Sequence, residues 1–487
     1  MPCTTLLVGK NASYDGSTLM ARNEDSGAGS FAPKKFIVVK PEDQPRLYIS
    51  ALSGVKITLP EDPMRYTACP NALPNEGIWG EAGINACNVA MSATETITSN
   101  ARVLGADPLL PCSIGEEDLL TIVLPYIHSA REGVLRLGAL LEEYGTYEMN
   151  AIGFQDVNEI WWLETIGGHH WMAKRVPDDA CVVMPNQLGI DSLDLRDALG
   201  EGRGNLCSRD LWEFIRENHL DLSMQPEEGL PTALDARAAF GSHTDADHCY
   251  NTPRAWDMLR RLIPHGAVWS GPRADYGPES DDLPWAVKPE HKLTVEEVKE
   301  ILSLHYQGTE FDPYGRYGDG GNRGKYRPIG INRNNFVAVT QLRPYLPAGL
   351  MALQWIAMGS NVFNGMVPFY ANVESTPAYL ADTDGKVTTD NFYWVSRLIA
   401  AMADPHYGSC IAHIERYRRR MAGLGHRLTA EAERSCLREL PEDLSAYLAE
   451  VNEKIAAEAK KETDELLGKV LYESSCHMKN AYSRSDG

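Results

Sequence analysis

Four short β-rich segments between residues 151 and 184 constrain the fold of this chain more than any other feature of its sequence. Gly, Asp or Pro residues separate each segment from the next, which is typical of strands joined by short turns. The spacing predicts an antiparallel meander. Its strands are expected at Ala151 to Phe154, Ile160 to Thr165, His170 to Val176, and Cys181 to Met184.

Two helices are expected directly before this meander. Between residues 116 and 145, apolar side chains recur at intervals of three and four, which is the period of an amphipathic helix. Ser113 with Glu116, and Ser129 with Glu132, have the spacing of capping boxes at helix starts. The segment therefore predicts two helices rather than one.

The remaining segments continue this mixed pattern over the 487 residues. Strands are expected within the first 40 residues and at residues 88–94, and helical pieces near 206–218 and 294–306. Residues 335–360 predict a strand followed by a helix, and the last hundred residues predict a charged helical region. This order of strands and helices indicates a layered α/β or α+β protein.

The composition describes a globular protein and argues against two classes. With 43% apolar and 23% charged residues, the chain is too apolar for wholesale disorder. The formal net charge of −21 disfavours a protein that binds nucleic-acid phosphates. No stretch approaches the ~18 consecutive apolar residues of a membrane span, and the first ten residues lack the pattern of a signal peptide. We therefore expect a cytoplasmic protein that binds neither nucleic acid nor membrane, with its ten scattered cysteines as free thiols.

One cysteine, Cys3, lies where a structural cysteine is least expected. We expect Cys3 to Val8 to pair with Ser17 to Arg22 around an eight-residue loop. In that register Cys3 lies directly opposite Arg22, with their Cβ atoms about 5 Å apart, and Asp25 lies just beyond the strand end. A cysteine, a cation and a carboxylate are thus predicted to converge at the mouth of a hairpin.

Removal of residues 1 and 2 would give this cysteine its own base. The α-amino group of a chain-terminal cysteine has a reference pKa of about 7.7–8.0, so it can accept the thiol proton near neutral pH. Arg22 would favour the thiolate and a developing oxyanion, and Asp25 would hold the amine or the cysteine by hydrogen bonds. The alternative is a buried, inert Cys3 beside a structural pair of Arg22 and Asp25.

Several separate blocks of the sequence point to one family. The first block runs from Cys3 to Ser17 and continues at Ala21-Arg22-Asn23-Glu24-Asp25. Further blocks are Gly80 to Asn85, Met91 to Thr96, Trp162-Leu163-Glu164, Gly168 to Trp171, Arg175 to Asp179, and Pro185-Asn186-Gln187. Together they resemble the cysteine dipeptidase A family of N-terminal nucleophile (Ntn) hydrolases, which is related to penicillin V acylase and bile salt hydrolase. The resemblance covers most of the chain and is dense over residues 3–190.

This resemblance implies a fold and a set of site residues. The fold is an α+β, four-layer αββα sandwich with inserted helices, and the nucleophile lies on an inner strand. Cys3 is implied as the nucleophile, Arg22 and Asp25 as its immediate partners, and Asn186 as the residue that supports the site.

Two further roles are implied less directly. The oxyanion-hole residue falls within Ser92-Ala93-Thr94, where the acylases carry an Asn. Because this sequence departs from that pattern, Ser92 and Thr94 are candidates, and a backbone N–H is the alternative donor. The second site arginine of the acylases has its nearest counterpart around Arg333 to Phe336.

Four motifs that resemble ligand sites are better explained as structure. Residues 243–248 resemble a metallohydrolase run, but Asp245 replaces the middle histidine. His169 and His170 are adjacent, so on a strand they point to opposite faces and cannot chelate one ion; His169 is expected to have a structural or substrate-binding role. Residues 318–325 lack the spacing of a phosphate loop, and residues 382–385 lack the rest of a calcium loop. We expect neither a metal nor an organic cofactor.

The resemblance, together with the inferred site around Cys3, implies a thiol peptidase that hydrolyses dipeptides with broad specificity. Thiolate attack would form a tetrahedral oxyanion and then a thioester, and water would complete the hydrolysis. The predicted organisation is a propeptide at residues 1–2, a catalytic domain at 3–400, and a helical extension at 401–487 packed on it. An amidase acting on N-acyl amino acids or acyl drugs is the main alternative, and a non-catalytic scaffold is a third. The oligomeric state stays open, with a homo-oligomer as one alternative.

Overall fold

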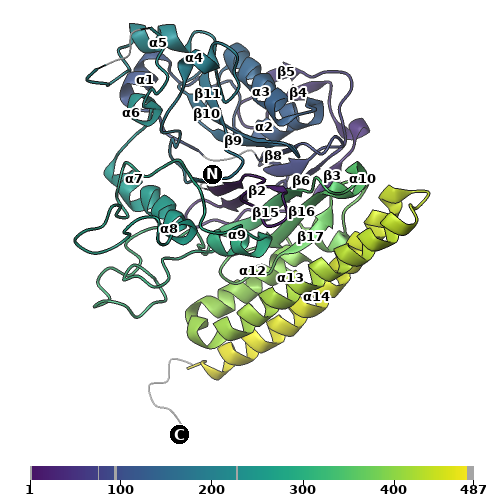
Figure 1. Cartoon of the computed structure of the whole chain (residues 1–487). Coiled ribbons are helices and arrows are strands. Elements are labelled where there is room, and N and C mark those ends of the chain that lie inside the picture. Colours follow the sequence, from purple (N-terminus) through teal and green to yellow (C-terminus); the bar gives the residue numbers. More distant parts are fainter. Residues whose placement is uncertain (1–2, 75, 93–95, 226–228, 480–487) are drawn as a thin grey trace.

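Two antiparallel sheets form the centre of the molecule, and helices cover their outer faces (Figure 1). The computed structural model describes residues 3–74, 76–92, 96–225 and 229–479. The mixture of helices and antiparallel sheets confirms the expected α+β class.

The first sheet carries the start of the described chain. Within the described residues it has seven strands in the order β14, β12, β1, β2, β15, β16, β17, each antiparallel to its neighbours. Their bounds are β1 (Cys3–Val8), β2 (Thr18–Asp25), β12 (Cys181–Met184), β14 (Ala286–Val287), β15 (Asn334–Leu342), β16 (Ala352–Met358) and β17 (Val367–Tyr370). The helix expected in the second half of residues 335–360 is wrong: after the short helix α10 (Ala348–Met351), the chain returns as β16 because that strand completes the sheet beside β15.

The second sheet contains the meander. In the described part of the chain its order is β13, β11, β10, β9, β8, β7. The bounds are β7 (Ala82–Ile84), β8 (Ala90–Ser92), β9 (Ala151–Gln155), β10 (Ile160–Ile166), β11 (His170–Arg175) and β13 (Asn205–Cys207). The meander is confirmed for β9, β10 and β11. It is wrong for its last strand, because β12 crosses to the first sheet and pairs with β1. Two small ribbons pair β3 (Ile37–Val39) with β6 (Tyr66–Ala68), and β4 (Leu47–Ile49) with β5 (Lys56–Thr58).

Helices connect and cover the two sheets. The two helices expected before the meander are confirmed as α2 (Glu116–Val123) and α3 (Ala130–Tyr144). The other helices before the C-terminal region are α1 (Ala101–Ala106), α4 (Leu195–Ala198), α5 (Leu211–Glu217), α6 (Ala236–Phe240), α7 (Asp245–Tyr250), α8 (Thr252–Leu262), α9 (Val295–Ile301), α11 (Ala378–Ala381) and α12 (Phe392–Ala403). Short 3₁₀ turns lie at Pro41–Asp43, Leu124–Tyr126 and Asp404–His406.

Alternating side chains of the strands build separate cores on the two faces of each sheet. Between the sheets, Leu7 and Met20 of the first sheet share a core with Trp162 and Met172 of the second. On the outer side of the second sheet, side chains of β9 and β10 pack with those of α2 and α3. On the outer side of the first sheet, β1, β2 and β15 pack with α8 and α9. The start of β1 therefore lies between the helices that cover the first sheet, α8 and α9, and those that cover the second, α2 and α3.

A pair of long helices ends the described chain. They are α13 (Tyr407–Arg438) and α14 (Leu444–Cys476), and they lie side by side along the lower edge of the molecule in Figure 1. Asn452 of α14 joins them to the first sheet: its Oδ1 accepts from the backbone N–H of Tyr370 at 2.9 Å, and its Nδ2 donates to the carbonyl of Tyr370 at 3.0 Å.

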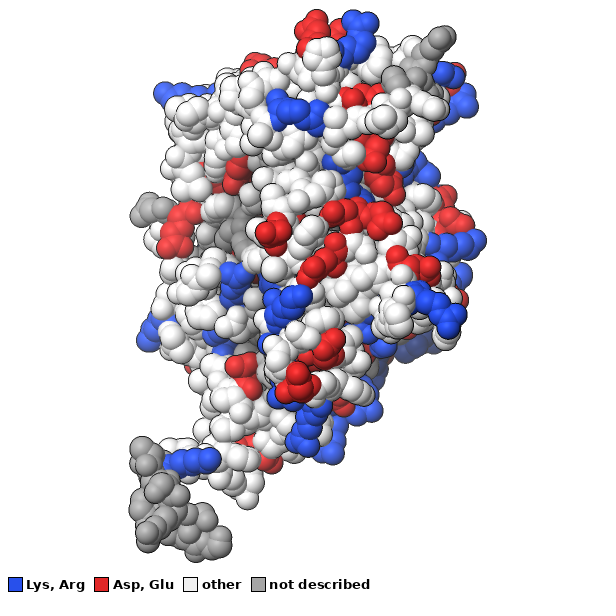
Figure 2. Space-filling model, turned by 90° about the vertical axis from the view of Figure 1, so that its left-hand side faces the viewer, with Lys and Arg blue, Asp and Glu red and all other residues white. Residues whose placement is uncertain are grey.

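The surface carries both signs of charge. On the face shown in Figure 2, acidic and basic side chains are interspersed. None of the helices in the described part of the chain combines the length and the apolar character needed to cross a membrane.

Replacement of Gly83 by Ala is predicted to destabilise the fold. Gly83 lies in β7, where an added Cβ would overlap the backbone carbonyl of Thr67, which cannot rotate away. Overpacking of this kind costs about 1–3 kcal/mol. Urea unfolding should show a lower free energy of unfolding for Gly83→Ala. The control is Gly105→Ala in α1, where a Cβ meets open space; equal stability of the two variants would contradict the prediction.

Candidate active site

The pairing of β1 with β2 brings Cys3 and Arg22 together. Thr5 lies opposite Arg22, and Cys3 lies opposite Glu24. The predicted register, with Cys3 opposite Arg22, is therefore wrong by two residues. The turn is longer than expected, because neither Ser17 nor Thr18 pairs with β1: Val8 lies opposite Leu19, and the carbonyl of Ser17 accepts from Ser13 Oγ at 2.6 Å. A shift of two residues keeps every side chain on its face of the sheet, so Arg22 still reaches diagonally to Cys3, and its Nη2 donates to Sγ at 2.7 Å.

Asn186 contacts the other end of Cys3. It follows β12 by two residues, and its Oδ1 accepts from the backbone N–H of Cys3 at 3.3 Å. The side chain is 7% exposed, and its Nδ2 has no hydrogen-bond partner among the described residues. The side-chain amide of Asn186 thus orients the nitrogen of Cys3 through Oδ1, and its Nδ2 remains a donor beside that residue.

A second arginine beside Cys3 comes from α8, and the sequence did not indicate it. Arg254 is fully buried, and its Nη1 donates to the carbonyl of Cys3 and to Thr4 Oγ1. Its Nη2 donates to Asn186 Oδ1 at 2.7 Å. Arg333, near which the counterpart of the acylase arginine was expected, donates to the hydroxyl of Tyr250, and the guanidinium of Arg254 lies over the ring of the same tyrosine. The role of Arg333 stays a prediction. The available signal for Arg254 was Pro253 at a helix start, followed by the apolar spacing of α8.

Asp25 is the last residue of β2 rather than a residue beyond the strand end. Strand alternation directs its side chain to the face opposite that of Arg22 and Glu24. There it accepts from Arg327 Nη2 and from Asn334 Nδ2. The predicted hydrogen bond between Asp25 and the amine or side chain of Cys3 stays a prediction.

Arg22 lies in a cluster of buried charges. Its guanidinium pairs with Glu81 and, at 2.9 Å, with Glu116 Oε1. Lys34 Nζ lies 2.7 Å from Glu24 Oε2 and 3.8 Å from Glu81 Oε1. All five side chains are at most 1% exposed. The cluster therefore places two cations and three carboxylates out of contact with solvent, beside Sγ.

Burial and mutual attraction shift the pKa values in this cluster. Burial by itself would lower the pKa of Arg22, but Cys3, Glu81 and Glu116 raise it well above its ordinary value. Burial, reinforced by the charge of Glu24, raises the pKa of Glu81 although Arg22 and Lys34 oppose it. Arg22 is therefore a permanent positive charge next to the thiol.

The backbone conformation places the side chains of Glu81 and Glu116 against the guanidinium of Arg22. Glu81 has a φ of 66°, in the left-handed region that is uncommon for residues other than glycine. Glu116 begins α2, but it does not cap the helix as the spacing from Ser113 predicted. The N-cap is Gly115, whose N–H donates to Asp118 Oδ2 at 2.9 Å, while Ser113 Oγ donates to Leu110. Because Asp118 takes the capping role, Glu116 remains available for Arg22.

The three weaker candidates lie in different places. Ser92 is the last residue of β8, and its buried Oγ has no hydrogen-bond partner among the residues that the structure describes. Thr94 lies outside the described residues. His169 lies in the turn between β10 and β11, where its Nδ1 bonds Asp107 at 2.8 Å. The contacts of His169 thus favour a structural role.

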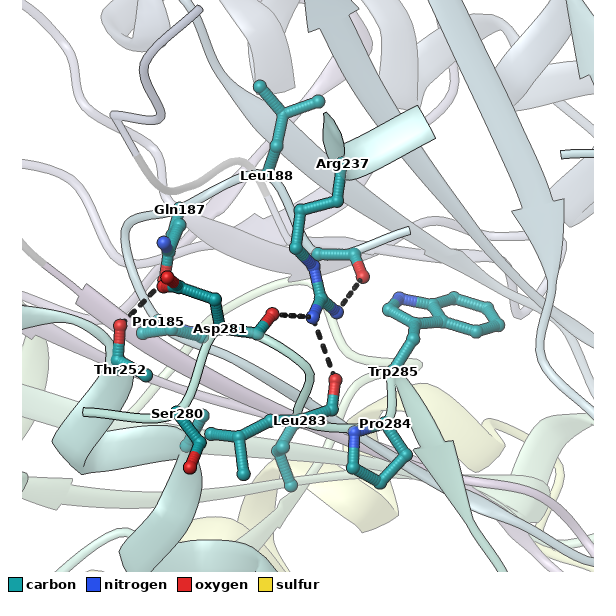
Figure 3. A pocket seen from close by; sticks show the side chains of 13 residues that line it. Pro185, Gln187, Leu188, Arg237, Thr252, Ser280, Asp281, Leu283, Pro284 and Trp285 are labelled. Atoms are coloured by element: carbon teal, nitrogen blue, oxygen red, sulfur yellow. Dashed lines mark hydrogen bonds between the residues drawn. The ribbon is translucent and has the colours of Figure 1, made fainter. Parts of the chain in front are cut away.

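A small cavity lies beside Pro185 and Gln187, the chain neighbours of Asn186 (Figure 3). Gln187, Thr252, Arg237 and Trp285 are among the residues that line it. Arg237 donates to the carbonyls of Gly189, Asp281 and Leu283. The cavity volume of about 30 Å³ suits a few water molecules, so it is too small for an amino-acid residue. Over the described residues, no group of three or more His, Cys, Asp or Glu side chains is arranged to hold a metal ion.

Comparison with known proteins identifies the class. A dipeptidase of Bifidobacterium longum (strain NCC 2705) is 54% identical over 536 aligned positions that cover 100% of both chains. A probable dipeptidase A of Streptococcus pyogenes serotype M3 (strain SSI-1) is 52% identical over 100% of both chains. Dipeptidase A of Lactobacillus helveticus is 41% identical over 99% of both. The present chain is accordingly a peptidase.

The family follows from a match over residues 2–420, which cover most of the chain. The chain belongs to peptidase family C69. The resemblance to the dipeptidase A family is thereby confirmed.

Proposed function

We propose that this protein is a cysteine dipeptidase of the Ntn-hydrolase type, with broad specificity and Cys3 as its N-terminal nucleophile. The observation that carries the proposal is the double contact of Cys3: Arg22 Nη2 lies 2.7 Å from its Sγ, while its backbone nitrogen donates to Asn186. The thiol and the backbone nitrogen of one residue are each held by a separate partner. The relatives named dipeptidase supply the substrate class.

The amine of Cys3 becomes a base when residues 1 and 2 are removed. As an amide nitrogen it can only donate, whereas a free α-amino group can accept the thiol proton. Asn186 Oδ1 then accepts a hydrogen bond from that amine and directs its lone pair. Arg22 stabilises the thiolate by its fixed charge.

Attack of the thiolate on the scissile carbonyl forms an S–C bond and an oxyanion. Asn186 Nδ2 is the donor suited to that oxyanion, since it is buried, beside Cys3 and unpartnered among the described residues. The role expected for Ser92 or Thr94 passes to Asn186 in this proposal. Collapse of the intermediate breaks the C–N bond, with the proton of the amine going to the leaving amino acid. Water then hydrolyses the thioester with the same amine as base.

The layering of helices and sheets supports the assignment to the αββα fold of Ntn hydrolases. Cores lie between the sheets and on both of their outer faces. In this assignment residues 1–2 are a propeptide, residues 3–400 form the catalytic domain, and the helices beyond residue 400 pack on it. The acylase alternative is disfavoured, because an apolar acyl group would lie against the carboxylates of Glu81 and Glu116.

Replacement of Cys3 by Ala is predicted to abolish hydrolysis of dipeptides such as Ala-Ala. The controls are Ala at Cys69, Cys181 and Cys436, which are buried cysteines whose pKa values burial raises, so they are poor nucleophiles. These variants should retain most of the activity. Substantial turnover by Cys3→Ala, measured as released alanine, would rule out the mechanism.

Replacement of Arg22 is predicted to lower kcat more than it raises KM. Loss of an electrostatic partner of the reacting group typically costs about 10²–10³ in rate. Arg22→Lys keeps the charge but not the planar fork that contacts Sγ and both carboxylates, so it should also be impaired. The control is Arg136→Lys: Arg136 lies on α3 and donates to the backbone carbonyl of Ile122 on α2. An effect of Arg22→Ala on KM alone would contradict the assigned role.

Active enzyme is predicted to begin at Cys3. The Cys3 thiol can attack the carbonyl of Pro2, transfer the propeptide from nitrogen to sulfur, and release it by hydrolysis of the thioester. The mass of the active protein should therefore lack residues 1 and 2, whereas Cys3→Ala should keep Pro2. The pH profile of kcat/KM should show an ionisation near neutral pH from the coupled amine and thiol. A fully active preparation that retains Pro2 would require another base.

A further inference from the structure

One carboxylate lies within two hydrogen-bond lengths of the proposed nucleophile. Arg22 Nη2 donates both to Cys3 Sγ, at 2.7 Å, and to Glu116 Oε1, at 2.9 Å. The same nitrogen therefore sets the separation between the sulfur and the carboxylate. A carboxylate that close to the sulfur is within reach of a group bonded to the carbonyl under attack.

We propose that Glu116 binds the α-ammonium group of the dipeptide and thereby restricts the enzyme to substrates with a free amino terminus. This inference rests on the proposed function, because it takes Cys3 as the nucleophile. In a dipeptide the ammonium nitrogen is two bonds from the scissile carbonyl carbon, or about 2.5 Å. A carbonyl poised for attack lies about 3–3.5 Å from the nucleophile. The ammonium is then confined to the neighbourhood of Sγ in which Glu116 lies.

A second group defines the place of that carbonyl. Asn186 is 7% exposed, its Oδ1 is bonded to Cys3, and its Nδ2 has no hydrogen-bond partner within the described part of the chain. A buried amide donor at this point requires an acceptor such as a carbonyl oxygen. The amide of Asn186 suits the carbonyl oxygen of an α-aminoacyl unit, and the carboxylate of Glu116 suits its ammonium group.

The carboxylate of Glu116 favours a cationic group over a neutral one. Three buried cations, Arg22, Lys34 and Arg254, balance the acidic side chains around Cys3, so the preference comes from Glu116 itself rather than from the net charge of the cluster. Glu148 lies against the same helix start, where its Oε1 accepts from the backbone N–H of Glu116 at 2.7 Å. An ammonium would donate a further hydrogen bond to Glu116. An N-acylated substrate would instead place a neutral group against this buried carboxylate, which is unfavourable.

The neighbouring acidic residues are held by other partners. Glu117 Oε1 accepts from Ser50 Oγ at 2.6 Å and from the backbone N–H of Leu52 at 2.8 Å. Asp118 caps α2 and accepts from Tyr48. Glu117 is thus a buried carboxylate on the same helical turn as Glu116, with contacts directed to another segment. It provides a matched control.

The test compares two substrates that differ only in the ammonium group. Ala-Ala and N-propionyl-alanine have the same scissile bond, and the second carries a hydrogen in place of the amino group. The ratio of their kcat/KM values should be large for the wild-type enzyme and should fall about 10- to 100-fold in Glu116→Gln, the loss typical of a hydrogen bond between charged groups. Glu117→Gln should keep the wild-type ratio. Any general effect of Glu116→Gln on Arg22 changes both substrates alike and cancels in the ratio.

Two outcomes would overturn the inference. One is an equal loss of activity on both substrates in Glu116→Gln, which would make Glu116 only a positioning residue for Arg22. The other is a wild-type enzyme that hydrolyses both substrates equally well. Where N-propionyl-alanine is hydrolysed too slowly, its inhibition constant against Ala-Ala replaces its kcat/KM. Failure of the proposed function is seen separately, as turnover of Ala-Ala by Cys3→Ala.

Discussion

A single buried guanidinium organises the site. Arg22 contacts Cys3 from β1, Glu81 from the segment before β7, and Glu116 from the start of α2. A buried cation is costly unless its hydrogen bonds and charge are satisfied. Closure of the sheets and of α2 around Arg22 is therefore what allows this arginine to be buried. The same closure fixes the surroundings of the thiol.

Such a cluster contributes little to stability, because desolvation of each charge offsets the attraction between them. An apolar packing of similar volume would hold the sheets together equally well. Five charged side chains at this point are better explained by the chemistry than by folding. In the proposed mechanism Arg22 supplies a permanent cation for the sulfur and Glu116 a carboxylate for the substrate, in a region where low polarity strengthens both effects.

Local patterns were sufficient for the parts of the site that lie close together in the sequence. Cys3 and Arg22 are 19 residues apart, and their pairing tolerated an error of two residues because such a shift preserves the face of each strand. Arg254 is 251 residues from Cys3. Pro253 and the apolar spacing that follows it predict the helix α8, but they do not predict that this helix packs against the sheet beside Cys3. The site role of Glu116 was not predicted for another reason. Its spacing from Ser113 predicted a helix cap, but Asp118 takes that role.

The contact between Asn452 and Tyr370 shows that the C-terminal helices cover an edge of the first sheet. β17 is an outer strand of the first sheet, and outer strands present unpaired backbone groups that invite association with other chains. The amide of Asn452 occupies both the N–H and the carbonyl of Tyr370, as a neighbouring strand would. The family match ends at residue 420, yet α14 protects the rim of the sheet. The last two helices therefore cover part of an exposed sheet edge, and their removal would leave the backbone of Tyr370 open to pairing with another chain.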